Sequence, residues 1–234
     1  SEAAIQLYRI FVEGECVVTN ARTAEMVKLT ENACRDVQIA FANELSIICD
    51  KLKINVWELI ALGNRHPRVN ILQPGPGVGG HCIAVDPWFI AGKSPEESRL
   101  ITAARRINDE KPNWVINKIK LMIADFMQAN PSKTASELSV SFYGLSFKPD
   151  IDDLRESPAM LIVDGISRYH SGPIKVVEPN IKDLPQILRN SNSELVCFEE
   201  SLNSDVKILL VDHKEFKNKA VKSDYLLDLK GIWQ

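Results

Sequence analysis

The residues whose types and spacing best suggest chemistry lie in a glycine-rich segment around one cysteine, Pro74-Gly-Pro-Gly-Val-Gly-Gly-His-Cys-Ile-Ala-Val-Asp86. Glycine lets a backbone approach a ligand closely, because no side chain stands in the way. Such a loop would present Cys82 to the ligand as a nucleophile, with the backbone of Gly79 and Gly80 lining the site. Asp86 follows four residues later, where it could act as a base or orient a water molecule. A tight structural turn holding a buried cysteine is the competing interpretation.

The same loop also matches the glycine fingerprint of dinucleotide-binding proteins, as Gly75-x-Gly77-x-x-Gly80. Its surroundings argue against that function. No β-rich run precedes the loop, Pro76 interrupts it, and Pro87 follows too soon for a helix. We therefore interpret the segment as a ligand-facing loop that carries a thiol.

A second set of polar residues lies in a run with helical periodicity. Lys28 and Asn32 are four residues apart, so they share one helix face with a rise of roughly 6 Å between them. Asp36 continues this stripe, and Glu25 lies about one turn before it. An ammonium and an amide side by side are good hydrogen-bond donors for a developing oxyanion. A solvated polar face is the alternative.

The third segment, Phe147–Pro158, contains the basic residues Lys148 and Arg155. It follows a short β-rich run and leads into a helix that Ser157 would cap. Two basic residues at a strand-to-helix crossing suit a phosphate-bearing ligand. The alternative is surface salt bridging of these two residues with Asp150, Asp152 and Asp153.

The first two segments would be positioned by helices. Asn20 suits an N-cap, and apolar residues recur at three- or four-residue spacing from there to Leu52. A helix of that length spans roughly 48 Å, which is typical of a spine between domains or of a subunit interface. Further helices are expected over Val56–Leu62, Glu96–Asn108 and Pro112–Gln128.

After residue 130, short β-rich runs alternate with amphipathic stretches, which predicts a small doubly wound, Rossmann-like parallel sheet. The expected strands are Val140–Tyr143, Lys175–Val177, Val206–Val211 and Tyr225–Leu229, and the expected helices are Pro158–Tyr169 and Leu184–Leu188. Such sheets bind ligands where their strands end. The sequence thus predicts an α/β protein with a central helical domain over 21–130 and the sheet domain over 131–234.

Composition excludes several classes of protein. The chain has 234 residues and a net charge of −3, and its pI of about 5.9 argues against nucleic-acid binding. No stretch approaches the roughly 20 apolar residues of a membrane span, and no signal peptide is visible. Five cysteines without a CxxC pair predict neither a disulfide framework nor a zinc site, and no metal is expected. Cys16, Cys34, Cys49 and Cys197 are expected to be buried in a reducing, cytoplasmic compartment.

The three segments together resemble the UDP-glucose/GDP-mannose dehydrogenase family, in the family's order. The motifs are AE-x-x-K-L-x-x-N at Ala24–Asn32 with a later Asn43-Glu44, G-x-G-x-G-G-x-C-x-x-x-D ending at Asp86, and F-K-x-D-x-x-D-x-R-E-S at Phe147–Ser157. The resemblance covers nearly the whole chain. It implies a central domain on a long helix and a C-terminal domain that binds the nucleotide sugar. The family's NAD-binding domain has no counterpart here, so residues 1–20 are expected to be its remnant and the chain to be inactive alone.

The resemblance also implies roles for individual residues. Cys82 corresponds to the nucleophile, which adds to an aldehyde as a thiohemiacetal, and Asp86 to its acidic partner. Lys28 and Asn32 correspond to the pair that stabilises the oxyanion and positions a water.

Three further residues correspond to binding residues of the family. Lys148 matches a lysine that contacts the nucleotide sugar, and Arg155 matches an arginine facing NAD. Arg68 matches an arginine that reaches the neighbouring subunit's substrate, although the stretch from Arg68 to Cys82 is shorter than in UDP-glucose enzymes. A homodimer through the long helix is expected.

The implied reaction oxidises C6 of a UDP-sugar from alcohol to carboxylate, using two NAD⁺ and one water. The run His81–Phe89 (HCIAVDPWF) is similar to family members that oxidise UDP-N-acetyl-mannosamine for bacterial surface polysaccharides. Pro or Gly in place of Ala84, and Tyr in place of Trp88, are typical of enzymes acting on UDP-N-acetyl-glucosamine or -galactosamine. The alternatives are a UDP-N-acetyl-glucosamine 6-dehydrogenase, a non-catalytic UDP-sugar-binding and dimerisation module, and a thiol-dependent aldehyde dehydrogenase.

Overall fold

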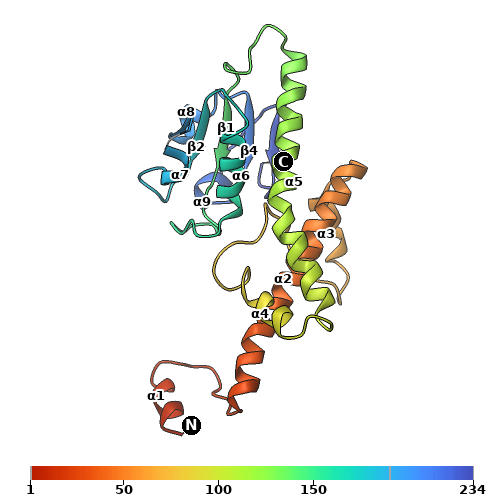
Figure 1. The fold of residues 1–234 in the computed structure, drawn as a ribbon, viewed down its shortest axis with the longest axis vertical. Coiled ribbons are helices and arrows are strands. Elements are labelled where there is room, and N and C mark those ends of the chain that lie inside the picture. The colour runs from red at the N-terminus through yellow and green to blue at the C-terminus, as the bar shows by residue number, and fades with distance from the viewer. Residues whose placement is uncertain (1, 190, 234) are drawn as a thin grey trace.

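The computed structural model describes residues 2–189 and 191–233, which form a helical part and a sheet part joined by one long helix (Figure 1). The helices are α1 (Glu2–Tyr8), α2 (Ala21–Leu52), α3 (Val56–Gly63), α4 (Asp86–Lys93), α5 (Arg99–Ala129), α6 (Pro158–Ser167), α7 (Gln186–Arg189), α8 (Phe198–Ser201) and α9 (Lys214–Lys217). The strands are β1 (Val140–Tyr143), β2 (Ile174–Val177), β3 (Ser193–Leu195), β4 (Val206–Leu209) and β5 (Leu226–Asp228).

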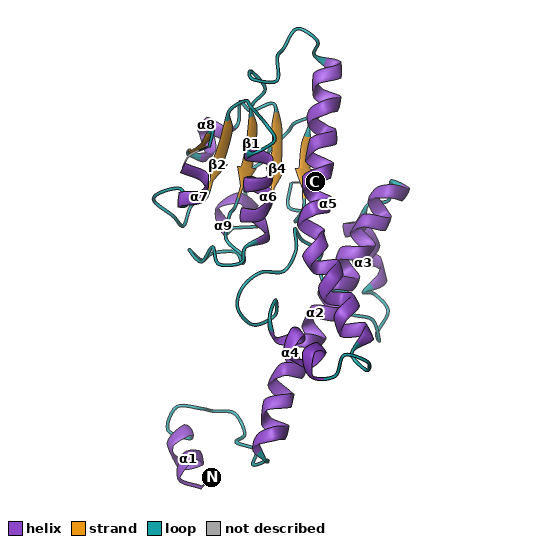
Figure 2. Cartoon of the chain, viewed as in Figure 1, coloured by secondary structure: helices purple, strands orange, loops and turns teal. Residues whose placement is uncertain are grey.

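The expected long helix is confirmed as α2, which is 32 residues long. The Asn20 side chain caps its start by accepting the Thr23 N–H at 2.9 Å. Lys53 ends it in the left-handed conformation, with φ 56°. Residues between these ends pack along α5, so the two helices form the core of the helical part (Figure 2).

The two helices expected over Glu96–Asn108 and Pro112–Gln128 are one continuous helix, α5, with Pro112 inside it. A proline there removes the hydrogen bond to the carbonyl of Asn108, four residues earlier. The glycine loop packs at this point: a methyl group on Gly77 would lie 3.2 Å from Pro112 Cγ and 3.3 Å from the Asn108 oxygen. Proline was therefore the wrong signal for a helix start, because packing compensates its local cost.

Within the described residues, five parallel strands form one sheet in the order β3-β2-β1-β4-β5. This confirms the doubly wound fold class, and it adds the short strand β3, which the sequence did not predict. Side chains alternate between the two faces. Phe142 and Ile208 join one core under α5 and α6, while Tyr143 and Leu209 join a second core with Phe216 of α9.

Helix α5 belongs to both parts of the molecule. Its second half contributes to the sheet core through Val115, Ile119, Ile123 and Phe126, all buried. The expected boundary at residue 130 therefore coincides with the end of α5, but the packing boundary lies within the helix. A helix shared in this way fixes the helical part against the sheet.

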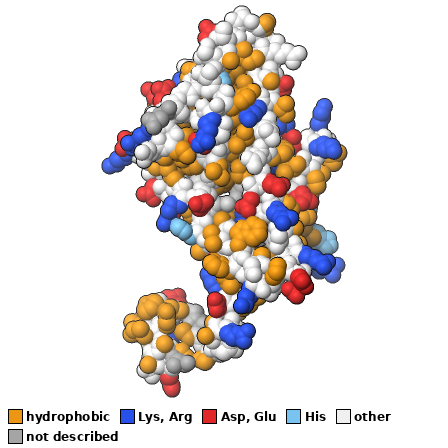
Figure 3. Space-filling view, viewed as in Figure 1, with side chains coloured by type: hydrophobic (Ala, Val, Ile, Leu, Met, Phe, Trp, Pro, Cys, Tyr) orange, Lys and Arg blue, Asp and Glu red, His pale blue; other side chains and the backbone are white. Residues whose placement is uncertain are grey.

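Helix α1 lies apart from the remainder of the chain at the bottom of the view, and apolar side chains cover it (Figure 3). Leu7, Ile10 and Phe11 are each at least 60% exposed. Among the residues that the structure describes, no helix combines the length and apolar character needed to cross a membrane.

Candidate active site

The expected nucleophile, Cys82, lies in a turn between the glycine loop and α4, and its side chain is exposed. The Asp86 N–H donates to the Cys82 carbonyl at 2.8 Å, which places the carboxyl group one turn after the thiol. From the sequence we expected Pro87 to prevent a helix here, and this expectation was wrong. Pro87 occupies the first turn of α4, where its missing N–H is not needed. The competing interpretation of a buried cysteine is excluded.

A hydrogen bond links the thiol turn to the long helix. Asn32 Nδ2 donates to Asp86 Oδ2 at 2.6 Å, although the two residues are 54 positions apart in sequence. Asn32 is buried, whereas Lys28, one turn earlier on the same face, is exposed and pairs with Glu31 at 3.6 Å. The structure thus links Asn32 to Asp86 and, through the turn, to Cys82. The Lys28 ammonium, one helical turn before Asn32, is exposed to solvent.

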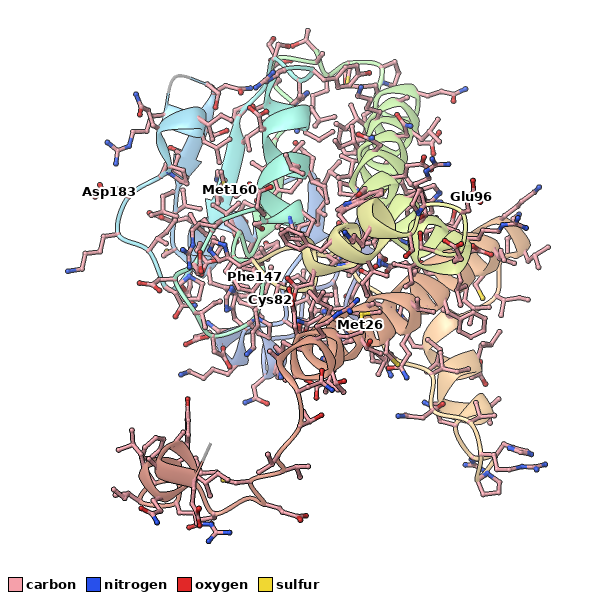
Figure 4. The ribbon with its side chains drawn as sticks, turned by 60° about the horizontal axis from the view of Figure 1, so that its bottom comes forward. Met26, Cys82, Glu96, Phe147, Met160 and Asp183 are labelled. Carbon is pink, nitrogen blue, oxygen red and sulfur yellow. The ribbon has the colours of Figure 1, made fainter. Side chains whose placement is uncertain are left out.

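The glycine loop is seated against the sheet domain. A methyl group on Gly79 would lie 2.8 Å from Phe147 Cβ and 2.9 Å from Pro158 Cδ. Gly80 has φ +83°, and its added methyl would meet the Phe147 ring at 2.8 Å. Figure 4 shows Cys82 next to Phe147 and beside the α2 segment that carries Met26. Phe147 therefore forms a floor for the loop, a role that sequence reasoning did not assign.

The three basic residues expected to bind ligands are all exposed. Lys148 lies in the loop after β1, and Arg68 lies in the segment after α3, where its N–H donates to His66 Nδ1 at 3.3 Å. Arg155 forms a fork with Asp153, through Nε at 2.9 Å and Nη2 at 2.6 Å. These hydrogen bonds lower the pKa of Asp153 to about 2. The surface salt bridging weighed as an alternative is thus present for Arg155.

Buried polar groups at the carboxyl edge of the sheet hold the loop that carries Lys148. Glu178 Oε2 accepts the N–H of Leu145 at 2.7 Å and His213 Nε2 at 3.0 Å. Burial alone would raise the pKa of Glu178, but the bonds from His213 and Leu145 outweigh it and lower the pKa. His213 Nδ1 accepts the Asp150 N–H at 2.9 Å, so the imidazole carries its proton on Nε2.

Asp150, His213 and Glu215 are the one group of side chains within the described ranges that could offer metal ligands, within 4.8 Å of one another. The His213 nitrogen on that side already accepts the Asp150 N–H and the Asn180 amide, at 2.9 Å and 3.2 Å. This cluster therefore acts as a loop anchor.

Sequence reasoning missed a buried polar network between α2 and α5. Arg105 Nη1 donates to Asp36 Oδ1 at 2.6 Å and to the Ile83 carbonyl at 3.3 Å. Asn108 Nδ2 also donates to Asp36 Oδ1, at 2.8 Å, and Asn43 Nδ2 donates to Asn108 Oδ1 at 2.9 Å. Burial raises the pKa of Asp36, and Arg105 and Asn108 offset part of that rise. The available signal was that Asp36 continues the stripe of Lys28 and Asn32 along one helix face.

The remaining cysteines correct another expectation. Cys49 is buried as expected, whereas Cys34 and Cys197 are exposed and Cys16 is half-buried. Cys34 lies on α2 and Cys197 directly precedes the short α8, and both cysteines are exposed.

Comparison with known proteins relates both parts of the chain to one family. The family model for the UDP-glucose/GDP-mannose dehydrogenase central domain matches residues 22–110, and the model for the family's UDP-binding domain matches residues 141–234. A UDP-N-acetyl-D-mannosamine dehydrogenase from Salmonella typhi is 59% identical over 100% of this chain and 56% of its own length. An NDP-N-acetyl-D-galactosaminuronic acid dehydrogenase from Ralstonia nicotianae is 54% identical over 100% of this chain and 53% of its own.

A solved structure of UDP-D-ManNAc dehydrogenase from Pyrococcus horikoshii superposes with a TM-score of 0.82 at 33% identity, covering 100% of this chain and 54% of that one. The chain spans about half the length of the curated relatives it matches. Two adjacent family models, matched in the order of the helical and sheet parts, leave one conclusion. This chain belongs to the UDP-glucose/GDP-mannose dehydrogenase family and comprises its central and UDP-binding domains.

Proposed function

We propose that this chain contributes the thiol site and the nucleotide-sugar site of an NAD-dependent 6-dehydrogenase that converts UDP-N-acetyl-D-mannosamine to the uronate. The observation that carries the proposal is the Asn32–Asp86 hydrogen bond of 2.6 Å, which joins the long helix to the turn containing the exposed Cys82. A thiol, an amide donor and a carboxylate around one accessible surface suit the oxidation of an aldehyde to an acid.

Cys82 is the proposed nucleophile. Its sulfur adds to the C6 aldehyde, the carbonyl π-bond breaks, and the oxygen becomes an oxyanion. Lys28 and Asn32 supply the donors for that oxyanion from one face of α2. Loss of hydride from C6 then leaves a thioester on Cys82. The exposed ammonium of Lys28 is the cation proposed to lie beside the reacting sulfur and oxygen.

Asp86 is the proposed base for the final step. Its Oδ2 accepts from Asn32, so the carboxylate is fixed in orientation. Its other oxygen can take a proton from a water molecule as that water attacks the thioester. The C–S bond breaks, the thiol is regenerated, and the carboxylate product is released.

When bound, NAD⁺ would supply the hydride acceptor for both steps of this four-electron oxidation. Among the described residues, the glycine loop follows no strand, so it does not fit the pyrophosphate of a dinucleotide. Arg155 is the exposed group proposed to face the cofactor. We place most of the NAD site in the part of the enzyme that corresponds to the other half of its relatives' length.

The sheet domain is the proposed site for the UDP-sugar. Lys148, in the loop that Glu178 and His213 anchor, would contact it, and Gly79 and Gly80 would approach it through their backbones. The similarity to a UDP-N-acetyl-D-mannosamine dehydrogenase supports the choice of sugar. The relative named for N-acetyl-D-galactosaminuronic acid is 54% identical, so a second N-acetyl-hexosamine should be tested as a substrate as well.

A second copy of this chain is the proposed partner. On the outer face of α2, Phe41, Ile48 and Leu52 are exposed, and Leu45 is half-buried between them. Their 4-3-4 spacing is that of a coiled-coil seam, which buries its apolar stripe against another helix. Arg68 would reach the neighbouring site from such a dimer.

The exposed free thiols of Cys34, Cys82 and Cys197 support a reducing compartment, which we take to be the cytoplasm.

Calorimetry on the chain itself tests the binding half of this proposal. We expect UDP and UDP-N-acetyl-mannosamine to bind, Lys148→Ala to weaken both by about tenfold or more, and NAD to bind weakly or not at all. The chain could bind UDP and still show no turnover when it is extended to the full length of its relatives. That result would favour a dimerisation and binding module. Absence of UDP affinity would favour a thiol-dependent aldehyde dehydrogenase instead.

A further inference from the structure

We propose that Arg105 is a positioning residue that holds the Cys82 turn in place from the buried side. The effect of Arg105 on catalysis rests on the proposed function. The contacts of Arg105 do not depend on that function. Arg105 is completely buried in α5, at 0% exposure. Its Nη1 donates both to Asp36 of α2 and to the carbonyl of Ile83, the residue directly after Cys82.

The same network also holds the start of the glycine loop. Asp36 Oδ1 accepts from Asn108, and Asn108 Oδ1 accepts from Asn43. Asn43 Oδ1 in turn accepts the Gly75 N–H at 2.9 Å. One connected set of hydrogen bonds therefore holds the catalytic loop at two points, Gly75 and Ile83, with the thiol between them.

Stability alone does not explain this arrangement. Asp36 Oδ2 and Arg105 Nε are buried and have no partner among the described residues. Orphaned buried polar atoms weigh against folding, and an apolar pair of similar volume often does as well as a buried ion pair. Bridging two helices and the Ile83 carbonyl, by contrast, requires a planar group with several donors, which arginine has.

The outer arm of the guanidinium offers a matched control. Arg105 Nη2 bonds to Asp109, whose side chain is half exposed. Asp109→Asn therefore removes an ion pair from the same arginine without touching the bridge to Ile83. Arg105→Lys keeps a positive charge beside Asp36, but a single ammonium cannot span Asp36, Asp109 and Ile83.

Hydrogen exchange on the chain as it stands tests the proposal. The N–H groups of Val85 and Asp86 bond to the Cys82 carbonyl at 3.1 Å and 2.8 Å, so they report on the turn. In Arg105→Lys we expect both amides to exchange at least ~10-fold faster, while amides of Ile162 and Val163 in α6 stay within ~2-fold. Asp109→Asn should leave both sets within ~2-fold. Unchanged exchange at Val85 and Asp86, or equal acceleration in α6, would overturn the positioning role.

If Arg105→Lys does not fold, the paired change Asp36→Asn with Arg105→Gln removes both buried charges together, and the same amides are compared. A second readout is turnover by a version of the protein extended to the full length of its relatives. Arg105→Lys should lower kcat by ~10- to 100-fold with KM for the UDP-sugar within ~3-fold, because the nucleophile moves and the sugar site does not. A raised KM with unchanged kcat would contradict the proposal, whereas inactivity of the wild-type enzyme would reject the proposed function and leave the exchange test valid.

Discussion

At the scale of single residues, we expect a buried lysine without full compensation to make the stability of the fold depend on pH. Lys111 of α5 is 1% exposed, its ammonium bonds to Ser46, and it lies 4.3 Å from the centroid of the Trp114 ring. Burial lowers the pKa of Lys111 to about 7, and attraction to Asp50 offsets only part of that effect. In the unfolded chain the same lysine keeps its proton up to its ordinary pKa.

Between pH 7 and 9 the unfolded chain therefore binds more protons at Lys111 than the folded chain does. This group makes the free energy of unfolding rise with pH, by up to about 1.4 kcal/mol per pH unit. Lys111→Met should remove that contribution, and Lys222→Met, at an exposed position, should not. Urea denaturation at pH 7 and pH 9 under reducing conditions measures the difference. Identical pH slopes in both variants would rule out Lys111 as the source.

The sequence pointed to candidate residues around the thiol loop, but it did not point to the buried arginine behind them. The resemblance to a known family pointed to Cys82, Asn32 and Asp86, and the structure joins two of them through the Asn32–Asp86 hydrogen bond. Arg105 could not be predicted, because a charged residue in a helix normally indicates a solvated face. Its burial depends on Asp36, which is 69 positions away.

At the scale of elements, the glycine loop is shaped by how closely it approaches Phe147 and α6. An alanine at position 79 would place its methyl group 2.8 Å from Phe147 Cβ and against the Glu156 carbonyl. Gly79→Ala should therefore lower the free energy of unfolding by about 1–3 kcal/mol and weaken UDP-sugar binding. Gly92→Ala in α4 is the control, because no atom lies within 4 Å of the added methyl. It should leave stability unchanged or raise it by up to about 1 kcal/mol.

Thermal or urea unfolding of both glycine variants, followed by calorimetry with UDP, gives the comparison. Equal stability and equal affinity in Gly79→Ala would show that the loop does not depend on its close contact with Phe147.

Elements with strong local signals were predictable, and those fixed by packing were not. Asn20 and the apolar periodicity located the start and end of α2. The split of α5 at Pro112, the exclusion of a helix at Pro87 and the omission of β3 were errors. In the first case Gly77 packs so close to Pro112 and Asn108 that an added methyl group would crowd both, which is a contact between distant parts of the chain. β3 is an edge strand of three residues, too short to show periodicity.

At the scale of the whole molecule, the exposed apolar stripe on the outer face of α2 is the proposed dimer interface. A second copy packed along Phe41, Ile48 and Leu52 would bury side chains that are now 43–60% exposed. Phe41→Glu should convert a dimer to a monomer, because a carboxylate in the seam loses its hydration. Leu121→Glu, on an exposed face of α5, is the control and should leave the dimer intact. Analytical ultracentrifugation distinguishes the two masses, and a dimer that persists in Phe41→Glu would place the interface elsewhere.

The sulfur of Cys82 is proposed to carry the substrate between the two oxidation steps. Acid formation from UDP-N-acetyl-mannosamine should be measured for Cys82→Ala and, as a control, for Cys197→Ala, in the enzyme at the length of its relatives. We predict that Cys82→Ala loses acid formation by on the order of 10³-fold or more, with UDP-sugar affinity within about threefold, and that Cys197→Ala is unaffected. Full turnover to the acid by Cys82→Ala would contradict the covalent mechanism.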